Sequence, residues 1–135
     1  MSYQGYLVKV GSYEIPMGKY IKADSYSVYQ AVQDLDSYTD ANGYLQRNVL
    51  DHAPVKIEFE TPPMLTNTQF ADLMSNISAN YTIAKERKAS VTAYVPETDS
   101  YVTQDMYMPD IQPTIYGSYG GVLHYDAITL KFIGY

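Results

Sequence analysis

The chain has 135 residues and a formal net charge of -6, a balance that disfavours tight binding to the phosphates of nucleic acid. It contains no cysteine, which excludes disulfide bonds and thiolate metal sites. Hydrophobic residues make up 46% of the chain and charged residues 18%, which is typical of a folded protein, and the length suits a single domain over residues 1–135.

The start of the chain lacks the basic residues and long apolar run of a secretory signal. No stretch approaches the ~18 apolar residues of a membrane-spanning helix. We therefore expect a protein that is made in a cytoplasm and kept there until something releases it.

Residues 5–16 predict the first hairpin, two short strands around Gly11-Ser12. A second β-rich stretch is expected over residues 19–29. Its apolar members are Tyr20, Ile21, Tyr26 and Val28.

A polar, acidic segment then runs from Gln30 to Ala53, far longer than the 4–6 residues that join most elements. Asn42-Gly43 in its middle predicts a type I′ turn, with apolar residues on both sides. We therefore expect a long, two-stranded β-arm over about residues 30–53.

Residues 54–60 give the clearest strand pattern, with Val55, Ile57 and Phe59 on one face. Thr66 and Gln69 have the spacing of a capping box, so a helix is predicted over about residues 67–81. Apolar residues recur along one stripe of this helix, which should face a sheet. They are Phe70, Leu73, Met74, Ile77 and Tyr81.

Residues 89–95 and 101–108 predict a hairpin joined by residues 96–100. Residues 114–119 and 122–135 flank Gly120-Gly121, and the second of these is expected as one long strand. Ile128, Leu130 and Phe132 would lie on its buried face. Together these elements predict a mainly β fold: an antiparallel β-sandwich or open barrel, one flanking helix and the β-arm.

No pattern in the chain indicates an active site. His52 and His124, the only histidines, lie in different predicted elements and belong to no Ser-His-acid signature. The glycine-rich run at 117–121 lacks the lysine of a phosphate-binding loop, which favours a hairpin turn. We expect no enzymatic activity and no cofactor.

Three aspartates in the arm invite comparison with a calcium loop. Asp34, Asp36 and Asp40 do not have the spacing of the twelve-residue loop, which needs glycine at its sixth position and glutamate at its twelfth. Aspartate also favours turns through local hydrogen bonds. We interpret these residues as turn formers and expect no metal.

Two groups of residues resemble a small family of phage and prophage tail proteins. The first is QDLDSYTDANGYLQRNVLDH at 33–52 with KIEFET at 56–61, and the second is ERKA at 86–89, DMYMPD at 105–110 and IYG at 115–117. The resemblance covers nearly the whole chain. It implies a tail-tube-like or distal-tail-like β domain of long-tailed phages, whose copies form six-fold rings.

The resemblance also implies where the protein is found and what it contacts. It would be a virion structural protein of the tail, made in the cytoplasm of a bacterial host. Its partners would be further copies of itself in a self-assembled hexameric ring, together with tube, tape-measure or tip proteins. We expect no membrane partner, and DNA would at most pass through the lumen, which an acidic protein suits.

Within this hypothesis the arm contacts an adjacent subunit, and exposed strand edges supply the complementary surface. Tyrosine and arginine often carry interface energy, and Arg47 would pair with an acid across the contact. Deleting residues 36–46 should leave a folded monomer that cannot assemble. The expected contact residues are Asp34, Asp36, Tyr38, Asp40, Tyr44, Leu45 and Arg47.

A second hypothesis starts from the sixteen tyrosines. The chain would be a carbohydrate- or peptide-binding β-sandwich module in which exposed tyrosines stack on a ligand. Tyrosine suits surfaces that are wet before assembly and dry afterwards, but it also favours half-buried strand faces. Self-assembly together with a blank glycan array would decide against a binding module.

Overall fold

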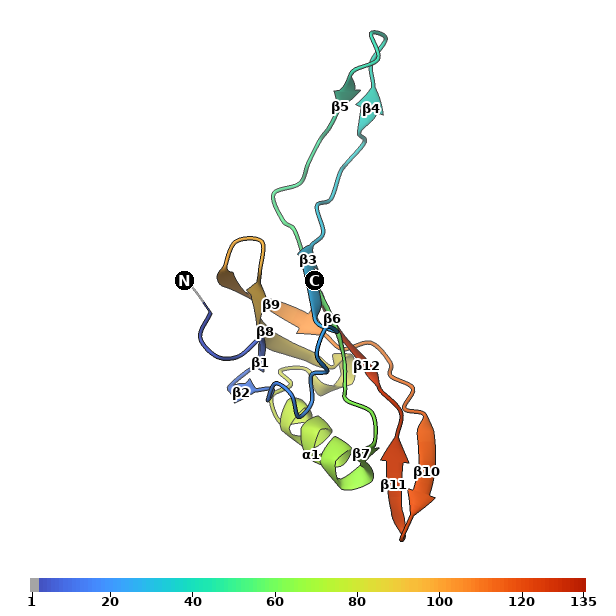
Figure 1. Cartoon of the computed structure of the whole chain (residues 1–135). Coiled ribbons are helices and arrows are strands. Elements are labelled where there is room, and N and C mark those ends of the chain that lie inside the picture. The colour runs from blue at the N-terminus through green and yellow to red at the C-terminus, as the bar shows by residue number, and fades with distance from the viewer. Residues whose placement is uncertain (1–2) are drawn as a thin grey trace.

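The computed structural model describes residues 3–135 and confirms a mainly antiparallel β fold with one α-helix (Figure 1). Its three sheets have the strand orders β2-β1-β8-β9-β12-β6-β3, β10-β11-β7 and β4-β5. A short 3-10 helix at Ala84–Glu86 precedes β8. The other elements are β1 (Val8–Val10), β2 (Tyr13–Glu14), β3 (Ser27–Gln30), β4 (Tyr38–Thr39), β5 (Leu45–Gln46), β6 (Val55–Glu60), β7 (Leu65–Thr66), α1 (Asn67–Ser78), β8 (Lys88–Val95), β9 (Ser100–Tyr107), β10 (Ile115–Tyr119), β11 (Val122–Tyr125) and β12 (Thr129–Gly134).

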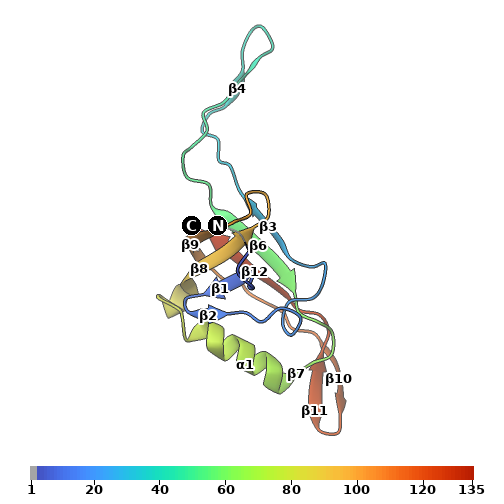
Figure 2. The same ribbon diagram turned by 60° about the vertical axis from the view of Figure 1, so that its left-hand side comes forward.

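The seven-stranded sheet curls into an open barrel (Figure 2). Its edge strand β3 comes into contact with β8, which lies in the other half of the sheet. Tyr26, just before β3, donates a hydrogen bond from Oη to the backbone oxygen of Tyr94 at 2.9 Å. The hydroxyl of Tyr26 thus ties the two halves of the sheet together.

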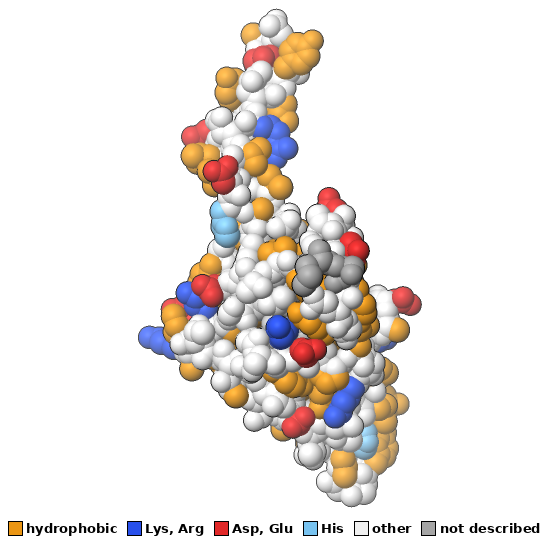
Figure 3. Space-filling view, turned by 90° about the vertical axis from the view of Figure 1, so that its left-hand side faces the viewer, with side chains coloured by type: hydrophobic (Ala, Val, Ile, Leu, Met, Phe, Trp, Pro, Cys, Tyr) orange, Lys and Arg blue, Asp and Glu red, His pale blue; other side chains and the backbone are white. Residues whose placement is uncertain are grey.

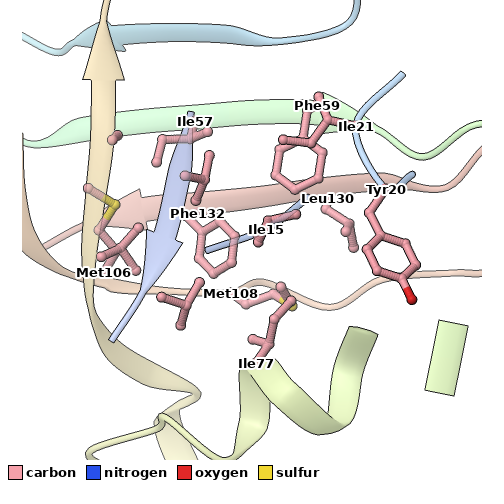
Figure 4. Packing of buried hydrophobic residues seen from close by; sticks show 14 of the residues in the cluster. Ile15, Tyr20, Ile21, Ile57, Phe59, Ile77, Met106, Met108, Leu130 and Phe132 are labelled. Carbon is pink, nitrogen blue, oxygen red and sulfur yellow. The ribbon is translucent and has the colours of Figure 1, made fainter. Parts of the chain in front are cut away.

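The core fills the concave side of this sheet and is closed by α1 (Figure 4). Ile57 and Phe59 of β6 and Phe132 of β12 are almost fully buried, as their alternating pattern predicts. Leu73 and Ile77 complete the core from the helix. Burial of these side chains is the main favourable contribution to folding.

The predicted capping box starts α1 as expected. Thr66 Oγ1 accepts a hydrogen bond from Gln69 N at 3.2 Å, and Gln69 Oε1 accepts one from Thr66 N at 3.1 Å. The helix ends at Ser78, three residues before the predicted boundary, yet Tyr81 beyond its end still packs against the core.

The predicted hairpins around Gly11, between β8 and β9 and around Gly120-Gly121 are also present. Gly11 has a φ of 60°, and Gly120 and Gly121 have φ angles of 61° and 77°. Two consecutive positive φ angles define a type I′ turn, which suits the twist of the strands that it joins.

The stretch at 19–29 is a strand only in its last part, β3. Tyr20 and Ile21 are adjacent and both are buried, which a strand with one buried face cannot provide. Asp24 has a φ of 64°, and Lys22 N donates to Glu60 O at 2.7 Å. Residues 16–26 are therefore a loop that covers one part of the core.

The predicted long strand at 122–135 is two strands, β11 and β12, that belong to different sheets. Thr61 stabilises the break between them: Thr61 N donates to Ile128 O, and Ile128 N donates to Thr61 Oγ1, both at 2.9 Å. Thr61 is fully buried. Ile128, Leu130 and Phe132 are nevertheless buried as predicted.

Candidate subunit interface on the arm

The segment between β3 and β6 projects from the rest of the molecule (Figure 1). We call residues 31–53 the arm and the remainder the body. The arm contains β4 and β5, with Tyr38 opposite Gln46 and Thr39 opposite Leu45. The predicted two-stranded β-arm is thus confirmed.

Two irregularities interrupt the pairing within the arm. At its root, Ala31 N donates to Pro54 O and Leu50 N donates to Gln33 O, both at 2.8 Å. Between these bonds the outgoing strand has only Val32, whereas the return strand has residues 51–53, which form a bulge. A second irregularity lies farther out at Asp36, which has a φ of 54°. Such bulges bend and twist a hairpin.

The turn at the tip is not of type I′. That type needs a positive φ at both central residues, but only Gly43, with a φ of 87°, has one. Gly43 N donates to Asp40 O at 3.0 Å, and Asp40 N donates to Tyr44 O at 2.8 Å. The loop therefore has three residues: a type I turn followed by a glycine in the left-handed conformation.

The carboxylate of Asp40 holds this turn together. It accepts hydrogen bonds from the backbone nitrogens of Tyr44 and Asn42, both at 3.0 Å, and from Gln46 Nε2 at 2.9 Å. The bond from Tyr44 N is the main reason that the pKa of Asp40 lies below its usual value. Asp40 thus acts as a turn former, as its residue type suggests.

Arg47 lies against Asp34 across the arm. Its Nη2 donates to Asp34 Oδ1 at 2.8 Å and its Nε donates to Asp34 Oδ2 at 3.3 Å. Hydrogen bonding from Arg47 lowers the pKa of Asp34 and in turn raises that of Arg47. Arg47 was expected to pair with an acid across a subunit contact, whereas its partner here is in its own arm. Its role in an interface stays a prediction.

The arm exposes large apolar side chains along its whole length (Figure 3). Three of them, Tyr38, Tyr44 and Leu45, are expected contact residues, and Tyr44 is 71% exposed. The other four were not singled out from the sequence, although no apolar residue of a projecting arm can reach the core. They are Val32, Leu35, Val49 and Leu50.

This concentration of exposed apolar side chains favours contact with another molecule. Isolated exposed hydrophobic residues are normal, but clusters of them mark interaction sites. A two-stranded hairpin on its own is also marginally stable at best in water. A partner that covers these side chains would stabilise the arm.

Unpaired strand edges offer complementary surfaces. The strands β2 and β3 form the edges of the large sheet, and β10 forms an edge of the three-stranded sheet. Ile115, Tyr116 and Tyr119 of β10 are more than half exposed. The β10–β11 hairpin lies at the end of the molecule opposite the arm (Figure 1). An unpaired edge can add a strand from another chain.

The two histidines make unrelated contacts in different parts of the molecule. His52 Nε2 contacts the backbone oxygen of Tyr135, and the ring of His124 packs edge-on against Tyr119. In the described part of the chain, no group of three or more His, Cys, Asp or Glu residues is placed to hold a metal ion. No helix among residues 3–135 is long and apolar enough to cross a membrane.

Several tyrosines pack on one another instead of presenting free faces. The ring centroids of Tyr6 and Tyr101 are 4.8 Å apart, and those of Tyr94 and Tyr101 are 5.5 Å apart. Tyr3 extends this group, with its ring centroid 5.6 Å from that of Tyr94. Tyr101 Oη also donates to Tyr6 O at 2.8 Å. These contacts favour a structural role for this group over a platform for ligand stacking.

The fold and the site define a small antiparallel β protein with one helix and a projecting arm. The chain belongs to DUF6711, a family of unknown function whose model matches residues 1–135. No curated protein matches the sequence.

Among solved structures, the chain is similar to one from the tail of an empty GTA (gene transfer agent) particle with C6 symmetry. The TM-score is 0.51 at 14% sequence identity, over 97% of this chain and 91% of the other. At this identity the likeness concerns the fold. It agrees at that level with the sequence resemblance to tail proteins.

Proposed function

We propose that this protein is a structural component of a phage or phage-like tail that assembles into a hexameric ring through its arm and its sheet edges. The exposed apolar arm carries the proposal, and the likeness in fold to a chain of a C6-symmetric tail supports it. Its place would be the tube, the distal tail or the tip. Its neighbours there would be tube, tape-measure or tip proteins.

The separation of the two surfaces suits ring formation. A ring needs heterologous contacts, in which one patch of a subunit meets a different patch on the next copy. The arm and the unpaired edges of β2, β3 and β10 are different surfaces of one chain. An isologous dimer would use the same patch twice and would leave the other surfaces unused.

The outer part of the arm can be replaced while the root of the arm is kept. Replacing residues 34–49 by Asn-Gly keeps the hydrogen bond from Leu50 N to Gln33 O, which is the bond that closes a two-residue hairpin turn. This design is preferable to deletion of residues 36–46, which provides no turn. The shortened chain should fold and remain monomeric.

The test compares the shortened and full-length chains by mass photometry and negative-stain electron microscopy over a range of concentrations. The full-length chain should form rings and the shortened chain should not. Ile83→Ser serves as a matched control, because Ile83 is an exposed apolar residue of the body, away from the arm. Rings from the shortened chain, or only monomers from the full-length chain at high concentration, would contradict the proposal.

A further inference from the structure

The root of the arm is held by a side chain from another part of the sheet. Gln104 of β9 accepts a hydrogen bond at Oε1 from Val55 N at 3.0 Å, and its Nε2 donates to Ala53 O at 3.2 Å. Along an extended chain, the carbonyl of one residue and the N–H two residues later point to the same side, where a neighbouring strand binds them both. The side-chain amide of Gln104 therefore takes the place of the backbone N–H and C=O of one residue in a neighbouring strand.

A strand partner is missing at this position because the pairing of β12 with β6 stops one residue before Val55. This pairing runs from Thr129 opposite Glu60 to Ile133 opposite Lys56. The next residue, Gly134, pairs with Met106 of β9. Val55 N is thus left at the end of the β6–β12 ladder, and Gln104 reaches it there.

Gly134 leaves the space that Gln104 needs. A Cβ atom at this residue would lie 2.8 Å from Gln104 Oε1, 2.9 Å from Val55 N and 3.0 Å from Val55 O. Real Cβ atoms do not approach other atoms so closely, so any other residue here would displace the Gln104 amide or the start of β6. The absence of a side chain at Gly134 is therefore a requirement of this arrangement.

The bulge of the arm root has a second contact with the body. His52 Nε2 contacts the backbone oxygen of Tyr135. Tyr135 is itself fixed: its ring packs against Tyr107 with centroids 5.5 Å apart, Lys88 Nζ lies 4.7 Å from its ring centroid, and its Oη donates to Glu86 Oε1 at 2.7 Å. The bulge at 51–53 is thus held by β9 and by the residue that follows β12.

We propose that Gln104 and Gly134 orient the arm. This inference rests on the proposed function, because a fixed direction matters for an arm that must reach a site on a neighbouring copy. Gln104 is a positioning residue: it contacts the root of the arm and not the residues expected at the interface. An arm that is already oriented loses less conformational entropy on assembly, which strengthens the contact.

The direction of the arm can be measured directly because the chain has no native cysteine. Ala41→Cys near the arm tip and Thr68→Cys on α1 would carry spin labels, with the labelled chain diluted into unlabelled protein so that only distances within one chain are recorded. Electron paramagnetic resonance should give a narrow distance distribution. Gln104→Ala and Gly134→Ala should each broaden or shift it, whereas Gln112→Ala, at an exposed glutamine elsewhere, should not.

Gln104→Glu provides a second variant should loss of the whole side chain unfold the protein. It keeps the side-chain length and the acceptor for Val55 N but places a carboxylate oxygen against Ala53 O, so the distribution should again broaden. Thermal unfolding of each variant would serve as the check that its body is folded. In parallel, the concentration at half-assembly should rise by about tenfold for Gln104→Ala, because an arm that is no longer oriented loses more conformational entropy on assembly.

The outcomes separate this inference from the proposed function. An unchanged distance distribution in folded Gln104 and Gly134 variants would overturn the inference, whatever their assembly. A broader distribution with unchanged assembly would overturn the link between orientation and assembly. A third outcome is that the variants broaden a narrow distribution but the full-length chain never assembles. That outcome would support the orienting role and contradict the proposed function.

Discussion

Two hairpins of this molecule, β8–β9 and the arm, have similar lengths and opposite characters. Every residue of β8 pairs in one register, from Lys88 opposite Tyr107 to Val95 opposite Ser100, and alternate residues of β8 are buried. The arm changes register twice and buries none of its large apolar side chains. A buried face fixes the register of a strand, because a shift by one residue would expose the whole apolar set.

The arm lacks that constraint and depends on polar contacts instead. The Asp40 carboxylate shapes the tip, the pair of Arg47 with Asp34 braces the middle, and Gln104 holds the root. The buried core stabilises the body, whereas the arm exposes apolar side chains that a partner can cover. Changes in the buried core should alter folding, and changes in the exposed apolar residues of the arm should alter association.

The largest difference between the two regions should appear on removal of a buried ring. Phe132→Ala should lower the free energy of unfolding by about 3–5 kcal/mol, because it creates a cavity in the core. Leu45→Ala in the arm should change it by less than about 0.5 kcal/mol, as is usual for surface substitutions. Denaturant unfolding of both variants at low protein concentration gives the comparison. Similar losses for the two would mean that the arm is part of the folded core.

A smaller effect is expected from acid, which should loosen the arm before the body. Asp40 and Asp34 have lowered pKa values in the folded arm, through hydrogen bonds from Tyr44 N and from Arg47 respectively. Each therefore stabilises the folded arm at a pH above its unfolded value of 3.8, and this contribution is lost as the pH falls through the lower folded value.

In an NMR titration from neutral pH into this acidic range, the amide signal of Tyr44 should lose its folded-state chemical shift. The amide signals of β8 should keep theirs. Asp40→Asn removes the carboxyl that titrates and should weaken the pH dependence at the tip. Loss of the β8 signals at a higher pH than those of the arm would contradict the division between the two regions.

Much of the body could be predicted from the sequence because its signals are local. The alternation of Val55, Ile57 and Phe59 and the capping box of Thr66 and Gln69 each arise within a few residues. The strand ends could not be predicted in this way. The break before β12 depends on Thr61, which lies far away in the sequence and bonds to both backbone groups of Ile128.

The candidate interface on the arm could be predicted only in part, because some of its features depend on residues that are distant in the sequence. Length and the Asn42-Gly43 signal indicated an arm, but they could not distinguish a type I′ turn from the three-residue loop that the Asp40 carboxylate favours. The pairing of Arg47 with Asp34 depends on the register of the arm, which the bulges shift. Gln104 gives no signal in the sequence, because its role depends on where β12 leaves β6.

Photo-crosslinking from the arm tip can show whether the arm binds another copy of the chain. A benzophenone amino acid at position 44 in place of Tyr44 should, after irradiation of the assembled protein, give a ladder of covalent oligomers. The same group in place of Ile83 should not. Crosslinks from position 44 that stay within one chain would contradict the account.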